Sequence, residues 1–178
     1  GINTLAMADE MLLNTFAAIA QEESKSISQN QRLSIAKRME KGEYVASKAP
    51  YGYRLVNKKL KIFKPEAEVV CWIFQAYLNG LSIKTIADTL TAQGVPTRSG
   101  QEQWKANTIT YILTNEKYKG DALLQKSYTV DFLTKKVKTN EGKVPQYYVE
   151  NNHPAIIEPE LFDLVQSEIQ RRGKGSSR

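Results

Sequence analysis

The sequence predicts an α+β fold, in which a long N-terminal helix precedes a mainly helical, helix-turn-helix-like domain with small β-hairpins. Three observations predict it. Residues 3–41 contain neither proline nor glycine, and apolar side chains recur in them mostly at three- and four-residue steps. Four later segments show helical spacing between start and stop residues. Short segments near residues 51–63 and 120–150 alternate in the manner of strands.

Composition limits the classes of protein that this chain can represent. Its 178 residues, 41% of them hydrophobic, suit one domain of ordinary size or a small domain with an appendage. No apolar run approaches the roughly 18 residues of a membrane span, and Asp9 and Glu10 argue against a secretory signal. A single cysteine, Cys71, and a single histidine, His153, exclude an internal disulfide and a four-ligand zinc site. We therefore expect a cytoplasmic chain without metal or cofactor.

The positive charge is concentrated in one part of the chain. Residues 25–64 hold 11 Lys and Arg against two acids, a net charge of +9, whereas the other 138 residues sum to −3. A solvated surface usually mixes both signs, so this block favours a polyanion as the partner. The alternative is that the charge serves only solubility.

Residues 1–41 form the first expected segment, a long helix that Gly42 ends. Residues 5–20 are apolar and almost uncharged, while residues 21–41 are polar and basic. The first half should pack against another surface, either a second copy of the chain or another part of the same protein. The second half should face an anion.

An extended connector over residues 42–50 and a hairpin should follow the helix. Residues 51–56 and 59–63 alternate around a turn at residues 57–58. Pro65 then lies just inside a helix start, and Gly80 ends that helix. Cys71 falls within it, and we expect a partly buried side chain rather than a nucleophile because no base accompanies it.

Two further helices carry the most specific local pattern. Ser82 caps the first, Gly94 closes it, and Ala106 or Asn107 opens the second. The second helix should direct Ile109, Ile112 and Leu113 inward and leave four polar side chains outward. Helix-turn-helix proteins place such a helix in the major groove. However, the 13 residues of 93–105 exceed the usual turn, so a purely structural helix pair stays open.

The rest of the chain should form strands and a final helix. We expect strands near residues 122–124, 128–132 and 147–149 around a charged tip over residues 135–143. Pro159 should start the last helix, and residues 173–178 should form a mobile tail. The sequence shows no catalytic constellation, since His153 precedes a proline without an evident partner.

The chain resembles the large serine recombinases of the resolvase/invertase superfamily, the integrases and transposases of phages and conjugative or mobilisable elements. The matching stretches are FAAIAQEESKSIS (16–28), the basic run to Gly42, PYGYR (50–54), SIKTIA (82–87), GVPT (94–97), Trp104, ITYIL (109–113) with Asn115, YKG (118–120), HPAII (153–157) and LF (161–162).

This resemblance implies a fragment that begins after the family's catalytic serine domain and lacks its zinc ribbon. Residues 1–41 would be the helix that ends the catalytic domain, 42–50 a linker arm, and 51–172 the recombinase domain that binds the attachment site. The resemblance further implies dimers or tetramers of the full-length protein through residues 5–20, and action on bacterial DNA. No catalytic residue can be assigned, and we expect no strand cleavage by this chain alone.

Double-stranded DNA is therefore the expected partner, with residues of the arm, the hairpin and the two helices as contacts. Lys105 and Arg98 would lie beside the recognition helix, and Trp104 would fill the core beneath the loop. The candidate DNA-contacting residues are Lys25, Ser28, Arg32, Lys37, Arg38, Lys41, Lys48, Tyr51, Arg54, Arg98, Lys105, Asn107, Thr108, Thr110 and Tyr111. Two alternatives stay open: a stand-alone dimeric helix-turn-helix regulator, and a protein-interaction module with an incidental basic block.

Overall fold

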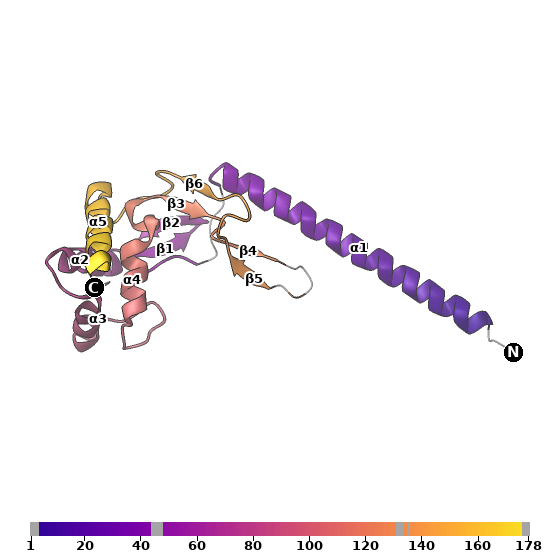
Figure 1. Ribbon diagram of the computed structural model, residues 1–178, viewed down its shortest axis with the longest axis horizontal. Helices are drawn as coiled ribbons and strands as arrows, with labels where there is room; N and C mark the ends of the chain where they lie inside the picture. Colours follow the sequence, from indigo (N-terminus) through magenta and orange to yellow (C-terminus); the bar gives the residue numbers. More distant parts are fainter. Residues whose placement is uncertain (1–3, 44–47, 131–133, 135, 176–178) are drawn as a thin grey trace. The chain divides into compact units, whose positions relative to one another are not determined.

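The computed structural model describes residues 4–43, 48–130, 134 and 136–175, and it confirms the α+β class. The chain divides into two compact units. The first comprises residues 1–44 and 125–147, and the second comprises residues 45–124 and 148–178. Residues 125–147, which we expected within the domain 51–172, thus group with the long helix. Figure 1 shows the elements of each unit.

The first unit contains the long helix α1, Thr4–Glu40, close to the predicted bounds. Gly42 ends it in a left-handed conformation with φ 69°, where its N–H donates to Met39 O at 3.0 Å. The Glu43 N–H donates to Arg38 O at 2.8 Å, which completes a Schellman-type end. The predicted stop at Gly42 is confirmed. Residues 44–47 of the expected arm lie outside the described residues.

A two-stranded hairpin also belongs to the first unit. Strand β4, Ser127–Thr129, pairs antiparallel with β5, Val137–Thr139, and Tyr128 faces Lys138. Our assignment of residues 135–143 wholly to a charged tip was wrong, because residues 137–139 form a strand. Buried Asn140 then closes the following turn: its amide donates to Gln125 O and Val144 O, and its Oδ1 accepts from the Val144 N–H.

The second unit begins with the predicted hairpin. Strand β1, Tyr53–Val56, pairs with β2, Lys59–Ile62, around Asn57 and Lys58, which have φ of 50° and 60°. Positive φ at both turn residues is the two-residue geometry that suits the twist of a hairpin. Tyr53 is fully buried, and its hydroxyl lies 2.9 Å from Pro154 O and 3.1 Å from Lys117 O. The hairpin is thereby held onto the later part of the same unit.

In the described part of this unit, four helices pack around the core (Figure 1). They are α2, Lys64–Leu78; α3, Ile83–Ala92; α4, Ala106–Thr114; and α5, Pro159–Gly175. Helices α2 and α4 each contact the other three. The Ser82 hydroxyl accepts from the Thr85 N–H at 3.1 Å, so the predicted cap of α3 is confirmed. Helix α5 extends to residue 175, so residues 173–175 of the expected tail are helical.

Short elements complete the second unit. A 3₁₀ turn, Glu116–Lys119, leads into β3, Ala122–Leu124, which pairs with β6, Tyr147–Val149. Buried Tyr118 in that turn donates its hydroxyl to Tyr51 O at 3.0 Å. In the described part of the chain, no helix combines the length and the apolar character that crossing a membrane requires.

Candidate nucleic-acid interface

The outward face of α4 is the first candidate surface. Ile109, Ile112 and Leu113 are at most 1% exposed and fix the orientation of the helix. The side chains of Asn107, Thr108, Thr110 and Tyr111 are all exposed, as predicted. The helix spacing puts amide, hydroxyl and phenol groups on one solvent-facing surface, and such groups hydrogen-bond to base edges. The Thr110 hydroxyl donates to Ala106 O at 3.1 Å, which leaves its methyl group and oxygen lone pairs for a partner.

The loop between α3 and α4 is folded onto the core. Trp104 is 3% exposed, its Nε1 donates to Val95 O at 2.8 Å, and its backbone N–H donates to Thr91 Oγ1 at 2.9 Å. Farther along, Thr97 Oγ1 donates to Gln101 O and accepts from the Gln101 N–H. The predicted core position of Trp104 is confirmed. Lys105 follows directly as the exposed residue before α4.

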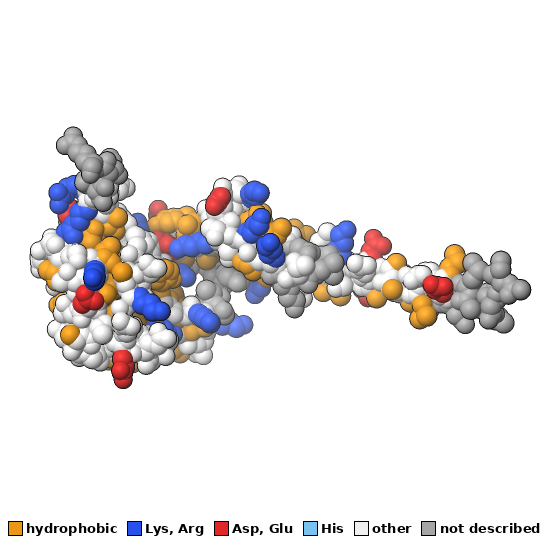
Figure 2. Space-filling model, turned by 60° about the horizontal axis from the view of Figure 1, so that its bottom comes forward, with side chains coloured by type: hydrophobic (Ala, Val, Ile, Leu, Met, Phe, Trp, Pro, Cys, Tyr) orange, Lys and Arg blue, Asp and Glu red, His pale blue; other side chains and the backbone are white. Residues whose placement is uncertain are grey.

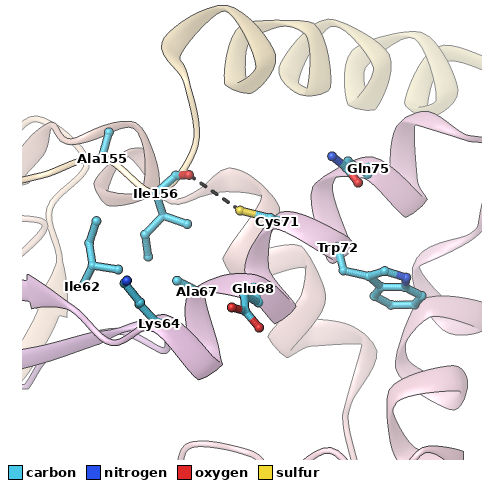
Figure 3. Close-up of a pocket in the computed structure, with 9 residues that line it drawn as sticks. All are labelled: Ile62, Lys64, Ala67, Glu68, Cys71, Trp72, Gln75, Ala155 and Ile156. Atoms are coloured by element: carbon cyan, nitrogen blue, oxygen red, sulfur yellow. Dashed lines mark hydrogen bonds between the residues drawn. The ribbon is translucent and has the colours of Figure 1, made fainter.

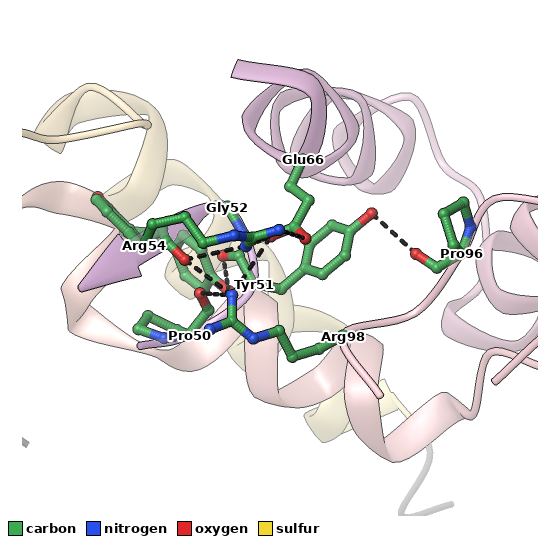
Figure 4. Close-up of polar contacts among 9 residues, drawn as sticks. Pro50, Tyr51, Gly52, Arg54, Glu66, Pro96 and Arg98 are labelled. Carbon is green, nitrogen blue, oxygen red and sulfur yellow. Dashed lines mark hydrogen bonds and ion pairs between the residues drawn. The ribbon is translucent and has the colours of Figure 1, made fainter. Parts of the chain in front are cut away.

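A cluster around Glu66 links three segments of the second unit (Figure 4). Both terminal nitrogens of Arg54, on β1, donate to the Glu66 carboxylate at 2.7 Å. The Gly52 N–H donates to Glu66 Oε2 at 2.8 Å. Arg98, in the loop before α4, donates to Tyr53 O at 2.8 Å and lies 3.6 Å from Glu66 Oε2. The hairpin, the start of α2 and the loop therefore meet at one carboxylate.

The protonation state of Glu66 follows from these contacts. Burial alone would raise the pKa of its carboxyl group. Hydrogen bonds from Arg54 and Gly52, together with the charges of Arg54 and Arg98, outweigh burial and lower that pKa. Glu66 is therefore a carboxylate at neutral pH. Sequence reasoning missed this residue; an acid in the first turn of a helix directly after a basic hairpin was the available signal.

Tyr51 is a buried residue next to this cluster. It is 7% exposed, its ring meets Trp104 edge-on at 5.1 Å, and its hydroxyl donates to Pro96 O at 3.2 Å. Burial, and then the nearby charge of Glu66, raise the pKa of Tyr51 to about 12. Tyr51 thus belongs to the core beneath the loop, whereas the guanidinium groups of Arg54 and Arg98 reach solvent.

The second half of α1 is the second candidate surface, in the first unit. The side chains of Lys25, Arg32, Lys37, Arg38 and Lys41 are exposed, and Ser28 is half-buried. Figure 2 shows the blue side chains of α1 from its middle toward its C-terminal end. None of these five bases forms an ion pair with another described residue. The same is true of exposed Lys48, in the second unit.

Within the second unit, the structure brings several predicted residues together. Arg54 and Arg98 meet at Glu66 over Tyr51, and the four polar residues of α4 share one face. The bases of α1 belong to the other unit. Among the described residues, no group of three or more His, Cys, Asp or Glu side chains could hold a metal ion.

An apolar hollow of about 350 Å³ lies on the second unit (Figure 3). Its walls include Ile62, Trp72 and Ile156. The Cys71 thiol lies in it, 3.7 Å from Ile156 O. Burial raises the pKa of this thiol, so it is a poor nucleophile, as its sequence context predicted.

Comparisons with known proteins identify relatives of this chain. The family model described as Recombinase matches residues 64–172. The protein named "Putative DNA recombinase" of Bacillus subtilis (strain 168) is 28% identical over 160 residues, which cover 84% of this chain and 32% of that protein. The chain thus spans about a third of the length of this curated relative.

Two solved structures are also similar to the chain. One is a crystal structure of an LSR–DNA complex, where LSR denotes a large serine recombinase. Its sequence is 26% identical to this chain and its TM-score is 0.58. The match covers 82% of this chain and 43% of that one. The other comes from work on the sequence requirements of the Listeria innocua prophage attP site. It is 26% identical with a TM-score of 0.55, over 82% of this chain and 53% of that one.

Proposed function

We propose that this chain, which belongs to the Recombinase family and carries the recombinase domain of a large serine recombinase, binds duplex DNA at the attachment sites of a mobile element. It would be the recognition part of a site-specific recombinase that integrates or excises that element, such as a phage or a conjugative transposon. The protein would act on the bacterial nucleoid.

One observation carries the proposal. Six bases between residues 25 and 48 are exposed, and none forms an ion pair with the described residues. A solvated structural surface normally pairs such charges with acids, whereas a DNA-binding surface leaves them for phosphates. The family supports the same partner, because a similar chain comes from an LSR–DNA complex.

The elements of the chain would have separate roles. Helices α3 and α4 would act as a helix-turn-helix variant with a long loop, and the polar face of α4 would read base edges in the major groove. Lys105 would lie at the rim of that groove. The bases of α1 and Lys48 would contact phosphates, which position a protein without reading sequence. Residues 5–20 would join copies of the full-length protein.

The test is a selection of bound duplexes from a random-sequence pool by the purified chain. Repeated rounds should enrich one motif, because base contacts discriminate by about 1–3 kcal/mol per well-read base pair. Asn107→Ala combined with Thr110→Ala should lose or relax that motif, while Gln170→Ala combined with Ser167→Ala, two exposed residues of α5, serves as the matched control. Recovery of a pool without any enriched sequence would refute attachment-site recognition.

A further inference from the structure

The Glu66 cluster has an internal acid and two external bases. The Glu66 side chain is 14% exposed, whereas those of Arg54 and Arg98 are 40% and 42% exposed. The carboxylate therefore lies beneath the two guanidinium groups and is shielded from solvent by them. A ligand that approaches from solvent would meet positive groups before it met the acid.

The two arginines are also held in defined positions. The Arg54 guanidinium forms a two-pronged pair with Glu66 and stacks 4.1 Å from the centre of the Phe63 ring. Arg98 Nη1 donates to Tyr53 O, which fixes its guanidinium beside the same carboxylate. Planar guanidinium groups held in this way lose little further conformational freedom when they bind an anion.

Donors and charge remain available in the cluster. Nε of Arg54, and Nε and Nη2 of Arg98, have no hydrogen-bond partner among the described residues. Two guanidinium groups against one carboxylate leave one excess positive charge. Exposed N–H donors with excess positive charge match the oxygens of a phosphodiester.

We propose that Arg54 and Arg98 form one binding site for a DNA backbone phosphate, and that Glu66 is its positioning residue. The inference rests on the proposed function, since it names one further contact of the same DNA-binding chain. Without the carboxylate, two like charges would lie next to each other and the bidentate contact that orients Arg54 would be lost. Glu66 thus promotes the binding of an anion although it is itself an anion.

Simple electrostatics and the positioning role predict opposite effects of Glu66→Gln on DNA affinity. Glu66→Gln adds one positive charge to the chain, so simple electrostatics predicts tighter DNA binding. The positioning role predicts weaker binding. Glu68→Gln is the matched control: it makes the same charge change two residues along α2, on an exposed side chain that belongs to none of the contacts of the cluster.

The full chain is titrated onto a mixed-sequence duplex by fluorescence anisotropy between about 50 and 200 mM salt. For Glu66→Gln we expect roughly tenfold weaker binding at low salt and a log–log salt slope about 0.9 shallower, the loss of one phosphate contact. Glu68→Gln should bind at least as tightly as the parent chain. Arg98→Gln should show the same shallower slope, and the double variant should lose no more than the single ones.

The outcomes separate the two proposals. If the parent chain binds duplex DNA with salt dependence but Glu66→Gln binds equally or more tightly, the phosphate site is refuted while DNA binding stands. Weaker binding with an unchanged slope would also refute it, since damage to the fold alone moves affinity without removing one phosphate. If circular dichroism shows that Glu66→Gln does not fold, the salt slope of Arg98→Gln tests the phosphate site. A shallower slope supports the site, and an unchanged slope refutes it. If the parent chain does not bind duplex DNA, the proposed function itself fails.

Discussion

Tyr53 illustrates how single side chains hold the second unit together. Its hydroxyl is fully buried and meets the carbonyl oxygens of Lys117 and Pro154. Tyr53→Phe should lower the free energy of unfolding by about 0.5–1.5 kcal/mol, because it removes a buried hydroxyl that donates a hydrogen bond to a backbone carbonyl oxygen. Urea denaturation measures this. Tyr147→Phe is the control and should change little, since its hydroxyl has no described partner; equal losses in both variants would contradict the assignment.

The backbone conformation at residue 120 favours glycine. The φ of Gly120 is 94°, and a Cβ there would lie 2.9 Å from the backbone oxygen of His153. Gly94 has a φ of 65° and open space around its missing Cβ. Gly94→Ala should therefore cost only the conformational strain of about 1–2 kcal/mol, and Gly120→Ala should cost clearly more in thermal or urea unfolding. Equal destabilisation by the two substitutions would show that the backbone near His153 shifts to accommodate the added methyl group.

His153 should make stability depend on pH. Burial lowers the pKa of its imidazole below the ordinary value of 6.5, against the opposing effect of its 2.7 Å contact with Lys117 O. The unfolded chain therefore takes up the proton first as the pH falls. The free energy of unfolding should be highest above about pH 6.5 and decline below it until the folded protein is also protonated. In His153→Gln, the decline that begins just below about pH 6.5 should vanish; its persistence would exclude His153 as the cause.

At the residue scale, local signals were predictable and tertiary ones were not. The Ser82 cap follows from its position just before a helical pattern of apolar residues. The burial of Trp104 follows from its being a large apolar side chain in an otherwise polar loop. Tyr51 and Arg54 looked alike as members of a basic, aromatic hairpin, yet one is buried and the other reaches solvent. The loop before α4 packs on the hairpin, which buries Tyr51 and leaves Arg54 in contact with solvent. No nearby sequence pattern predicts that contact.

At the element scale, helices were easier to predict than the strands beyond residue 124. The helices α2 to α5 carry a regular apolar face and clear start or stop residues. Strand β5, in contrast, consists of Val137, Lys138 and Thr139, all exposed, so it has no buried face to produce an alternating pattern. The long loop between α3 and α4 is ordered by the Trp104 and Thr97 hydrogen bonds, which spacing alone does not reveal.

The α4 face and the basic residues should have separable effects on DNA binding. Asn107→Ala should weaken binding to the selected sequence by about 1–3 kcal/mol and leave binding to scrambled duplex unchanged. Lys48→Ala should weaken both alike, because phosphates carry no sequence information. Competition between the two duplexes measures the ratio. If Lys48→Ala removes the preference and Asn107→Ala does not, the roles are reversed; a loss at Arg98 or Lys105 instead would move recognition to the loop.

At the scale of the whole molecule, α1 exposes an apolar surface that a lone chain leaves in water. Leu12, Phe16 and Ile19, spaced four and three residues apart on one face of α1, are 55%, 67% and 57% exposed. Exposed apolar patches of this kind mark interaction sites, so we predict concentration-dependent self-association. Phe16→Glu should shift sedimentation toward the monomer, whereas Asn14→Glu adds the same charge without removing an apolar side chain. An unchanged distribution for Phe16→Glu would place the contact elsewhere.

The central claim is that this recombinase-family chain binds duplex DNA through its exposed bases. The most direct measurement is the affinity of the parent chain for duplex DNA as a function of salt. If about four bases neutralise phosphates, log affinity should fall with log salt at a slope near −3.6. Replacing Lys37, Arg38 and Lys41 together by Gln should make that slope clearly shallower. A flat salt response of the parent chain, or no binding at low salt, would contradict the account.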